Sequence, residues 1–330
     1  MALISFDGFQ TYGSPADTSG KYAVFDGALG AGRRASSGAA ELSASGAITL
    51  LFSAASTLSR GFAYKQPTLF ATTILEFSTS LGEQLSLRTT ATGQLYVSRN
   101  GSTIWSSASD PTYRLKAGQW RYIEFSATIS TSAGTWALQV AGIPDSLVQG
   151  SGVNTAAQGG TTADRVTFRQ SAAGASAFAD TYLRNDLTFN GDCRVDRLLP
   201  SADGFHADYG VYGAATLALA LDDTSPNGDT DYIFSNTVGE IGSVHMADLA
   251  FTPETVFGVN AVYYAKLSEA GTRALSIGIR SGGTDDFGSP DGLTLAYARY
   301  EDFLADNPIT SLPFTISDIA SLELAVKTET

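Results

Sequence analysis

The chain has 330 residues, which exceeds the length that a single hydrophobic core usually stabilises, so two domains are expected. Its formal net charge of −13 argues against nucleic-acid binding, because phosphate recognition requires clustered Lys and Arg. No stretch approaches the roughly 20 apolar residues of a membrane span, and the opening MALISFDGF lacks the basic and apolar regions of a signal peptide. Neither membrane insertion nor ordinary export is expected.

Alternation of apolar and polar residues with a period of two dominates the chain and predicts an all-β protein. In the first part of the chain, clear examples lie at residues 85–89, 135–140 and 165–169. Between residues 95 and 105, Asn100-Gly101 separates two β-prone runs. Because a type I′ turn needs positive φ at both central residues, this pair predicts a β-hairpin.

Further along, residues 141–164 are rich in Gly, Ser, Thr and Ala and predict a long loop. A strand is expected over residues 192–199, with Cys193 inward as a core residue. Additional strands are expected at residues 217–221, 256–266, 273–280, 293–300 and 322–327. The predicted organisation is a β domain over residues 1–200, a linker over residues 201–212 and a smaller β-sandwich over residues 213–330.

One glycine-rich segment has the spacing of a dinucleotide-binding loop. Residues 30–35 read G-x-G-x-x-A, but such a loop must lie between a strand and a helix, and Ser36-Ser37-Gly38 does not open a helix. A turn with solvated Arg33 and Arg34 is therefore the better interpretation.

An acidic loop resembles part of a calcium-binding loop. Asp223, Asp229 and Asp231 surround Asn227-Gly228, and Ca²⁺ favours several oxygen ligands along a turn. The register differs, since Phe234 stands where a bidentate Glu is required. A Pro-Asn-Gly turn with solvated carboxylates is favoured, with these three Asp residues as the candidate Ca²⁺ ligands. No other cofactor is expected.

Residues suited to catalysis are isolated in the sequence. Glycoside hydrolysis requires two carboxylates, whereas Glu76 and Glu124 each stand alone on a predicted strand and are expected at the surface or an edge. His206 and His245 are the two histidines, and no serine nucleophile motif accompanies them. They are expected to be surface or interface residues. This pattern predicts that the chain is not an enzyme.

Two aromatic residues are candidates for a sugar-binding platform. Trp105 and Tyr113 lie near the predicted hairpin and the Asp110-Pro111 turn, where loops collect at one end of a sandwich. The alternative is that Trp105 packs in the core, as expected of Trp120 and Trp136, because Trp side chains are highly buried on average.

Four segments of the chain, at residues 117–129, 189–204, 222–233 and 271–288, carry a resemblance to a known family. The chain resembles bacteriophage virion structural proteins with a concanavalin A-like, laminin-G-like jelly-roll domain followed by a second β module. The resemblance covers most of the chain. It implies an all-β fold with a jelly roll over residues 1–200, and a virion protein assembled in the cytoplasm of a bacterial host.

The resemblance implies a structural role in the particle. The expected function is a fibre or spike protein attached to the tail or neck, with adhesion to host-surface polysaccharide. A capsid decoration protein, either a cement protein or a head fibre, is the alternative, and a polysaccharide depolymerase is a further one. The expected partners are other virion proteins and further copies of the chain. A homo-oligomer is expected because closed symmetry is usual, and a trimer is the first expectation, as for many fibres and spikes.

Overall fold

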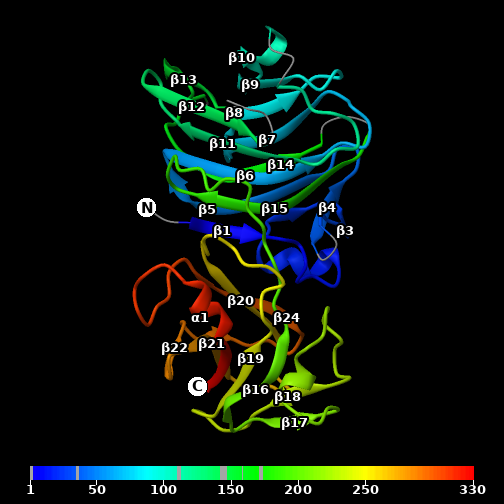
Figure 1. The fold of residues 1–330 in the computed structure, drawn as a ribbon, viewed down its shortest axis with the longest axis vertical. Coiled ribbons are helices and arrows are strands. Elements are labelled where there is room, and N and C mark those ends of the chain that lie inside the picture. The colour runs from blue at the N-terminus through cyan, green and yellow to red at the C-terminus, as the bar shows by residue number, and fades with distance from the viewer. Residues whose placement is uncertain (1–2, 35–36, 110–112, 142–146, 158, 171–173) are drawn as a thin grey trace. The chain divides into compact units, whose positions relative to one another are not determined.

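The computed structural model describes residues 3–34, 37–109, 113–141, 147–157, 159–170 and 174–330 (Figure 1). These residues form two compact units, one of residues 1–10 and 14–195 and the other of residues 11–13 and 196–330. Antiparallel strands dominate both, which confirms the all-β prediction. Within the described residues, no helix is long and apolar enough to cross a membrane.

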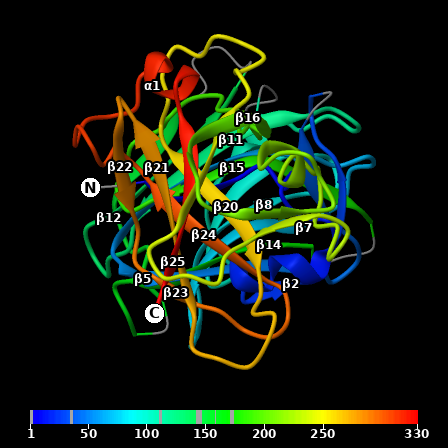
Figure 2. The same ribbon diagram turned by 90° about the horizontal axis from the view of Figure 1, so that it is seen from below.

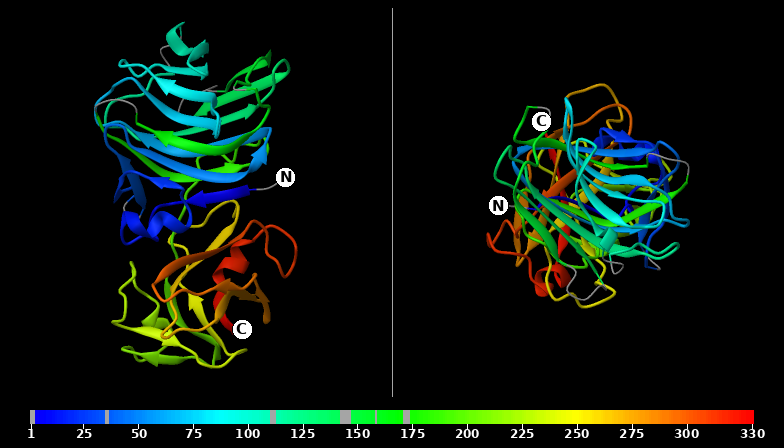
Figure 3. Two further views of the ribbon diagram at one scale, coloured as in Figure 1. Left: turned by 180° about the vertical axis from the view of Figure 1, so that it is seen from behind. Right: turned by 90° about the horizontal axis from the view of Figure 1, so that it is seen from above.

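The first unit is a jelly-roll sandwich of two antiparallel sheets, whose layers are visible in Figure 3. The eight-stranded sheet has the order β13 (Val148–Val153), β12 (Gly134–Val140), β11 (Arg121–Thr128), β6 (Thr57–Lys65), β15 (Ser176–Arg184), β4 (Gly38–Leu42) and β3 (Ala28–Ala31), with β1 (Leu3–Asp7) also paired to β15. The seven-stranded sheet has the order β10 (Ser102–Ser106), β9 (Leu95–Arg99), β8 (Gly82–Thr89), β7 (Thr72–Thr79), β14 (Ala163–Arg169), β5 (Ala47–Ala55) and β2 (Val24–Phe25). Two short 3₁₀ helices, η1 (Pro15–Gly20) and η2 (Ser107–Ser109), complete the unit.

Aromatic side chains join the two sheets of the sandwich. Phe125 of β11 stacks on Phe77 of β7 with ring centroids 5.7 Å apart, and Phe168 of β14 stacks on Phe178 of β15 at 4.3 Å. These rings are buried, and burial of an aromatic side chain contributes strongly to folding. Alternate residues of β11, such as Glu124, therefore face away from the core.

The predicted hairpin at Asn100-Gly101 is present. Strands β9 and β10 pair antiparallel with Ser102 opposite Arg99, and the two turn residues have φ of 44° and 83°. Positive φ at both positions is the requirement on which the prediction rested.

The second unit is built on a six-stranded sheet and two smaller sheets. The larger sheet has the order β16 (Pro200–Ala207), β19 (Ile241–Met246), β25 (Glu323–Glu329), β21 (Ala274–Ser281) and β22 (Thr284–Phe287), with β23 (Asp291–Gly292) also paired to β21. Figure 2 shows β22, β21 and β25 side by side. The smaller pairs are β17 (Gly210–Tyr212) with β18 (Tyr232–Phe234), and β20 (Val259–Ala265) with β24 (Ala298–Leu304). The helices here are η3 (Ala218–Ala220) and α1 (Ile316–Ala320).

Several local predictions differ from the structure. A strand was expected at residues 217–221, which instead contain the 3₁₀ helix η3. Residues 201–212, predicted as a linker, lie mostly in β16 and β17, and the chain passes between the units at residues 195–196. Residues 192–199 form no strand, and within them the Cys193 carbonyl and the Val195 N–H bond to the side chains of Arg33 and Asp180 instead of to a neighbouring strand. The predicted loop at residues 141–164 contains β13, which pairs with β12.

Candidate functional site

A polar cluster lies on the outer face of the eight-stranded sheet, the face turned away from the seven-stranded sheet. Glu124 of β11 is only 3% exposed, so the prediction of a surface or edge position is wrong. Its carboxylate accepts hydrogen bonds from the Tyr182 hydroxyl and from the Gly191 backbone N–H, the latter at 2.8 Å. Burial raises the pKa of Glu124 despite these two donors.

A glycine makes the contact between Glu124 and Tyr182 geometrically feasible. Gly61 of β6 lies between them, opposite Glu124 on one side and Tyr182 on the other. A Cβ on Gly61 would come within 2.0 Å of the Tyr182 ring. The missing side chain therefore lets the ring lie across β6 and reach Glu124.

The same face carries a second set of charges, which sequence analysis placed in solvent. Asp180 is fully buried and accepts hydrogen bonds from Arg33 at 2.6 Å and Arg34 at 2.9 Å. The Arg33 guanidinium also lies 4.9 Å from the centre of the Tyr122 ring. Burial of Arg33 opposes its charged form, but the bonds to Asp180 outweigh this effect and raise its pKa. The prediction of solvated arginines is wrong, because their partner lies 147 residues away in the sequence.

Residues 188–195, here named the cover segment, bind across this face through their backbone. The carbonyl of Thr188 accepts from Ser59 at 2.8 Å, and the N–H of Asn190 donates to Tyr182 at 3.1 Å. The carbonyl of Cys193 accepts from Arg33, and the N–H of Val195 donates to Asp180 at 3.0 Å.

Cys193, predicted as a core residue, is half-buried within this segment. Burial raises the pKa of its thiol to about 12. The thiol is consequently protonated at neutral pH and is a poor nucleophile.

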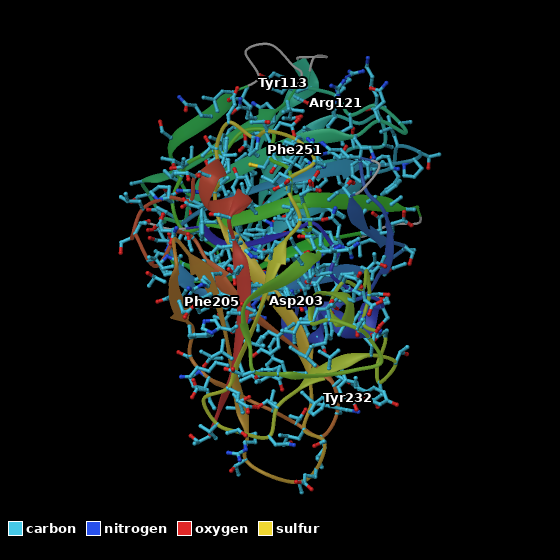
Figure 4. The ribbon with its side chains drawn as sticks, turned by 60° about the horizontal axis from the view of Figure 1, so that its bottom comes forward. Tyr113, Arg121, Asp203, Phe205, Tyr232 and Phe251 are labelled. Atoms are coloured by element: carbon cyan, nitrogen blue, oxygen red, sulfur yellow. The ribbon has the colours of Figure 1, made fainter. Side chains whose placement is uncertain are left out.

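The structure brings Trp105 and Tyr113 together, with ring centroids 6.1 Å apart (Tyr113 is labelled in Figure 4). Tyr113 is only 4% exposed, and Trp105 is half-buried against Trp136, 5.4 Å away. The contact with Trp136 corresponds to the alternative in which Trp105 packs inward. The adjoining Asp110-Pro111 turn lies outside the described residues. Sugar binding at this pair stays a prediction.

The three candidate calcium ligands form hydrogen bonds with nitrogen donors. Asn227 donates to both Asp223 and Asp231, and Asp229 pairs with Lys266 at 2.7 Å. The bond from Lys266 lowers the pKa of Asp229. Among the described residues, no group of three or more His, Cys, Asp or Glu is arranged to hold a metal ion. Binding of Ca²⁺ stays a prediction.

Exposed aromatic rings gather on the ribbon formed by β17 and β18. Tyr212, Tyr232 and Phe234 share one face of this ribbon, here named the aromatic face, because Tyr212 is opposite Tyr232 and Phe234 is opposite Gly210. The other face packs Val211 and Ile233 against a hydrophobic cluster. Tyr212 is 55% exposed and Phe234 46% exposed.

The rings of the aromatic face support one another. Tyr212 stacks on Tyr232 with centroids 4.9 Å apart and planes 24° apart, and Phe234 lies 6.2 Å from Tyr232 (labelled in Figure 4). This face was not predicted from the sequence, because its strands are three residues long and lie in a predicted linker and a predicted calcium loop.

Both histidines lie in a row of charges on the six-stranded sheet. His245, Glu323, Arg280 and Asp285 are consecutive partners across β19, β25, β21 and β22. His206 reaches Asp285 at 2.9 Å, and His245 lies 3.6 Å from Glu323. Phe205, 68% exposed, lies over Arg280 at 4.1 Å. Each carboxylate thus has a cationic or protonatable partner, and the row is a structural ion-pair network.

Comparison with known proteins identifies the fold alone. No family model matches the chain, and no curated protein matches its sequence. Among solved structures, the glycoside hydrolase family 131 catalytic domain from Coprinopsis cinerea matches at 12% identity and a TM-score of 0.39, covering 59% of this chain and 98% of that one. A galectin-like protein of unknown function from Bacillus subtilis matches at 10% identity and a TM-score of 0.37, covering 57% and 98%. The alginate lyase AlgAT5 of polysaccharide lyase family 7 matches at 8% identity and a TM-score of 0.32, covering 44% and 77%.

The two antiparallel sheets of the first unit define it as a jelly-roll β-sandwich, and the Bacillus subtilis structure is itself named as having a galectin-like fold. Several of the matching structures are named as carbohydrate-active enzymes, so the expectation that this chain is not an enzyme is corrected, and no activity of this chain follows from them. The lack of two catalytic carboxylates close together in the sequence did not justify excluding an enzyme, because the fold brings distant residues together. None of the three structures described above is a phage protein.

Proposed function

We propose that this chain is a structural component of a bacteriophage particle and that its second unit binds glycans at the aromatic face. The observation that carries glycan binding is the set of three neighbouring rings on one side of an exposed ribbon. Apolar faces of sugar rings pack on aromatic side chains, and exposed apolar patches of this kind mark interaction sites. The virion role rests on the sequence resemblance.

Polar groups beside the aromatic face suit sugar hydroxyls. The Tyr297 hydroxyl donates to Asp229 at 2.9 Å and also lies 3.0 Å from the Gly228 carbonyl, and Lys266 lies 4.5 Å from the centre of the Tyr297 ring. Burial and the bond to Asp229 raise the pKa of Tyr297 to about 12, so its hydroxyl keeps its proton. Sugar sites combine aromatic surface with a few oriented polar groups, and this arrangement supplies both.

A glycan array with the purified full chain tests the binding proposal. We expect retention on a subset of glycans, with loss of signal in the double variant Tyr212→Ala/Phe234→Ala. Phe205→Ala is the matched control, because it removes an exposed ring from the six-stranded sheet instead of the ribbon. Equal retention by the double variant would place binding elsewhere, and no retention on any glycan would overturn the proposal.

Cryo-electron microscopy of phage particles that encode the chain tests the virion role. Density for this chain at the tail or neck supports a fibre or spike, and density flat on capsomers supports a decoration protein. The symmetry of that density gives the oligomeric state, for which a trimer is proposed. Particles without this chain would contradict every virion role.

A second candidate function is glycan cleavage at the outer face of the eight-stranded sheet. The observation that favours it is the raised pKa of Glu124 beside two tyrosines and Arg33, since perturbed carboxylates concentrate at catalytic sites. Access would require the cover segment to move. Clearing of a polysaccharide lawn by the purified chain, lost in Glu124→Gln, would support it, and no clearing by the unsubstituted chain would contradict it.

A further inference from the structure

The net charge of the chain is concentrated in one unit. Residues 11–13 and 196–330 contain 20 acidic and 6 basic side chains, a formal charge of −14. Residues 1–10 and 14–195 contain 13 acidic and 14 basic side chains, a formal charge of +1. The second unit therefore generates a strongly negative field around its own surface.

The aromatic face lies within that field. The connection between β17 and β18 spans residues 213–231 and contains four Asp and no Lys or Arg. Three of these, Asp222, Asp223 and Asp229, are exposed, and Asp231 is half-buried. Lys266 pairs with Asp229, which leaves the surroundings of the rings with an excess of negative charge.

Two of these carboxylates lie close together. Asp223 and Asp231 share the amide of Asn227 as a donor. A further carboxylate from a ligand would be repelled by this pair, and Lys266 on Asp229 and Arg197 on the Thr224 carbonyl offset only part of the charge of the four Asp side chains.

We infer that the aromatic face is selective for uncharged and amino-bearing glycans and rejects uronate-containing polysaccharides. This inference rests on the proposed glycan-binding function and specifies its ligand class. Uncharged sugars stack on the rings without electrostatic cost, and protonated amino sugars gain attraction to the exposed Asp side chains. Each uronate sugar unit brings one negative charge into a field of the same sign.

Titration of the purified full chain with three hexasaccharides of matched length tests the inference. The probes are a neutral glucose hexamer, a glucosamine hexamer and a uronate hexamer. At low ionic strength we expect the uronate hexamer to bind at least about tenfold more weakly than the neutral hexamer. Near 0.5 M NaCl, where the Debye length is about 4 Å, the difference should shrink while the affinity for the neutral hexamer stays constant.

Charge variants separate the local carboxylates from an unspecific effect. Asp223→Asn/Asp231→Asn should reduce the difference in affinity between the neutral and uronate hexamers at low salt. Glu254→Gln/Asp306→Asn is the matched control, because these exposed residues lie near Val256 and Leu304 of the other hydrophobic cluster in this unit. The control should leave most of the gap in place.

The possible failures are distinguishable. Uronate binding as tight as neutral binding would overturn the charge selectivity and leave the proposed glycan binding standing. A gap that does not respond to salt or to the Asp variants would also overturn it, since the discrimination would then be steric. No binding of any hexamer would overturn the proposed function together with this inference.

Discussion

The ring of Phe234 packs against the backbone of Gly210, its partner across the β17–β18 ribbon. A Cβ at Gly210 would come within 2.5 Å of the ring. Glycine at this position therefore allows the ring to lie across the neighbouring strand, which orders the ring while Phe234 stays 46% exposed.

We expect Gly210→Ala to weaken glycan binding about three- to tenfold by displacing the Phe234 ring. Gly292→Ala is the control, because a Cβ at Gly292 meets no atom within 4 Å and its φ lies outside the left-handed region. Titration with the tightest-binding glycan from the array measures the effect. Unchanged affinity in Gly210→Ala would show that the ring position does not matter for binding.

Replacement of Gly101 tests the hairpin in isolation. A Cβ there meets nothing within 4 Å, but φ is 83°, so Gly101→Ala introduces backbone strain without a clash. We expect a loss of about 1 kcal/mol in the free energy of unfolding, measured by urea denaturation. Ser102→Ala, one residue on and exposed, should cost much less. Equal losses in the two variants would argue against strain as the cause.

Glu124 should make the protein less stable as pH rises. Its folded-state pKa is raised, so the folded protein binds the proton more tightly than the unfolded chain does, and stability falls as pH rises through the ordinary value towards the raised one. Glu124→Gln removes this dependence. Between acidic and neutral pH, the free energy of unfolding of the variant should rise relative to that of the unsubstituted chain. The rise should be about 1.4 kcal/mol for each unit by which the pKa of Glu124 is raised. A stability difference independent of pH would contradict the burial effect.

Asp285 should behave in the opposite sense. Burial alone would raise its pKa, but hydrogen bonds from Arg280 and His206 outweigh burial and lower it. The contribution of Asp285 to the free energy of unfolding is therefore present above its ordinary pKa and is lost as pH falls towards the lowered pKa. Asp285→Asn should cost about 1 kcal/mol at neutral pH, a figure reduced for partial exposure, and close to nothing in acid. Asp306→Asn, at an exposed position, is the control and should cost less than Asp285→Asn at neutral pH.

Local chemistry was readable from the sequence where neighbouring residues determine the structure. Asn100-Gly101 specifies its own turn, and period-two alternation specifies strands such as β12 and β14. The outer-face cluster was not readable, because Glu124 and Tyr182 are 58 residues apart and Arg33 and Asp180 are 147 apart. No local pattern reports which strands become neighbours, so Glu124 looked isolated.

The aromatic face shows the same limit from another direction. Tyr212 and Tyr232 each stand in a strand of three residues, too short for an alternation signal. Their proximity depends on the connection at residues 213–231, whose Asp content suggested a calcium loop, whereas Tyr212 itself lay in the predicted linker at residues 201–212. An informative signal was present in the sequence: Tyr232 and Phe234 alternate around Ile233 directly after a turn.

The cover segment bears on how the molecule responds to a pulling force. Its attachments to Asp180, Arg33, Glu124 and Ser59 follow one another along the chain from Val195 back to Thr188. A pulling force applied at Val195 would break these bonds one after another. The hydrogen bonds between β15 and β6 would instead bear the force together. The jelly roll would therefore release this segment at low force and keep its own sheets intact.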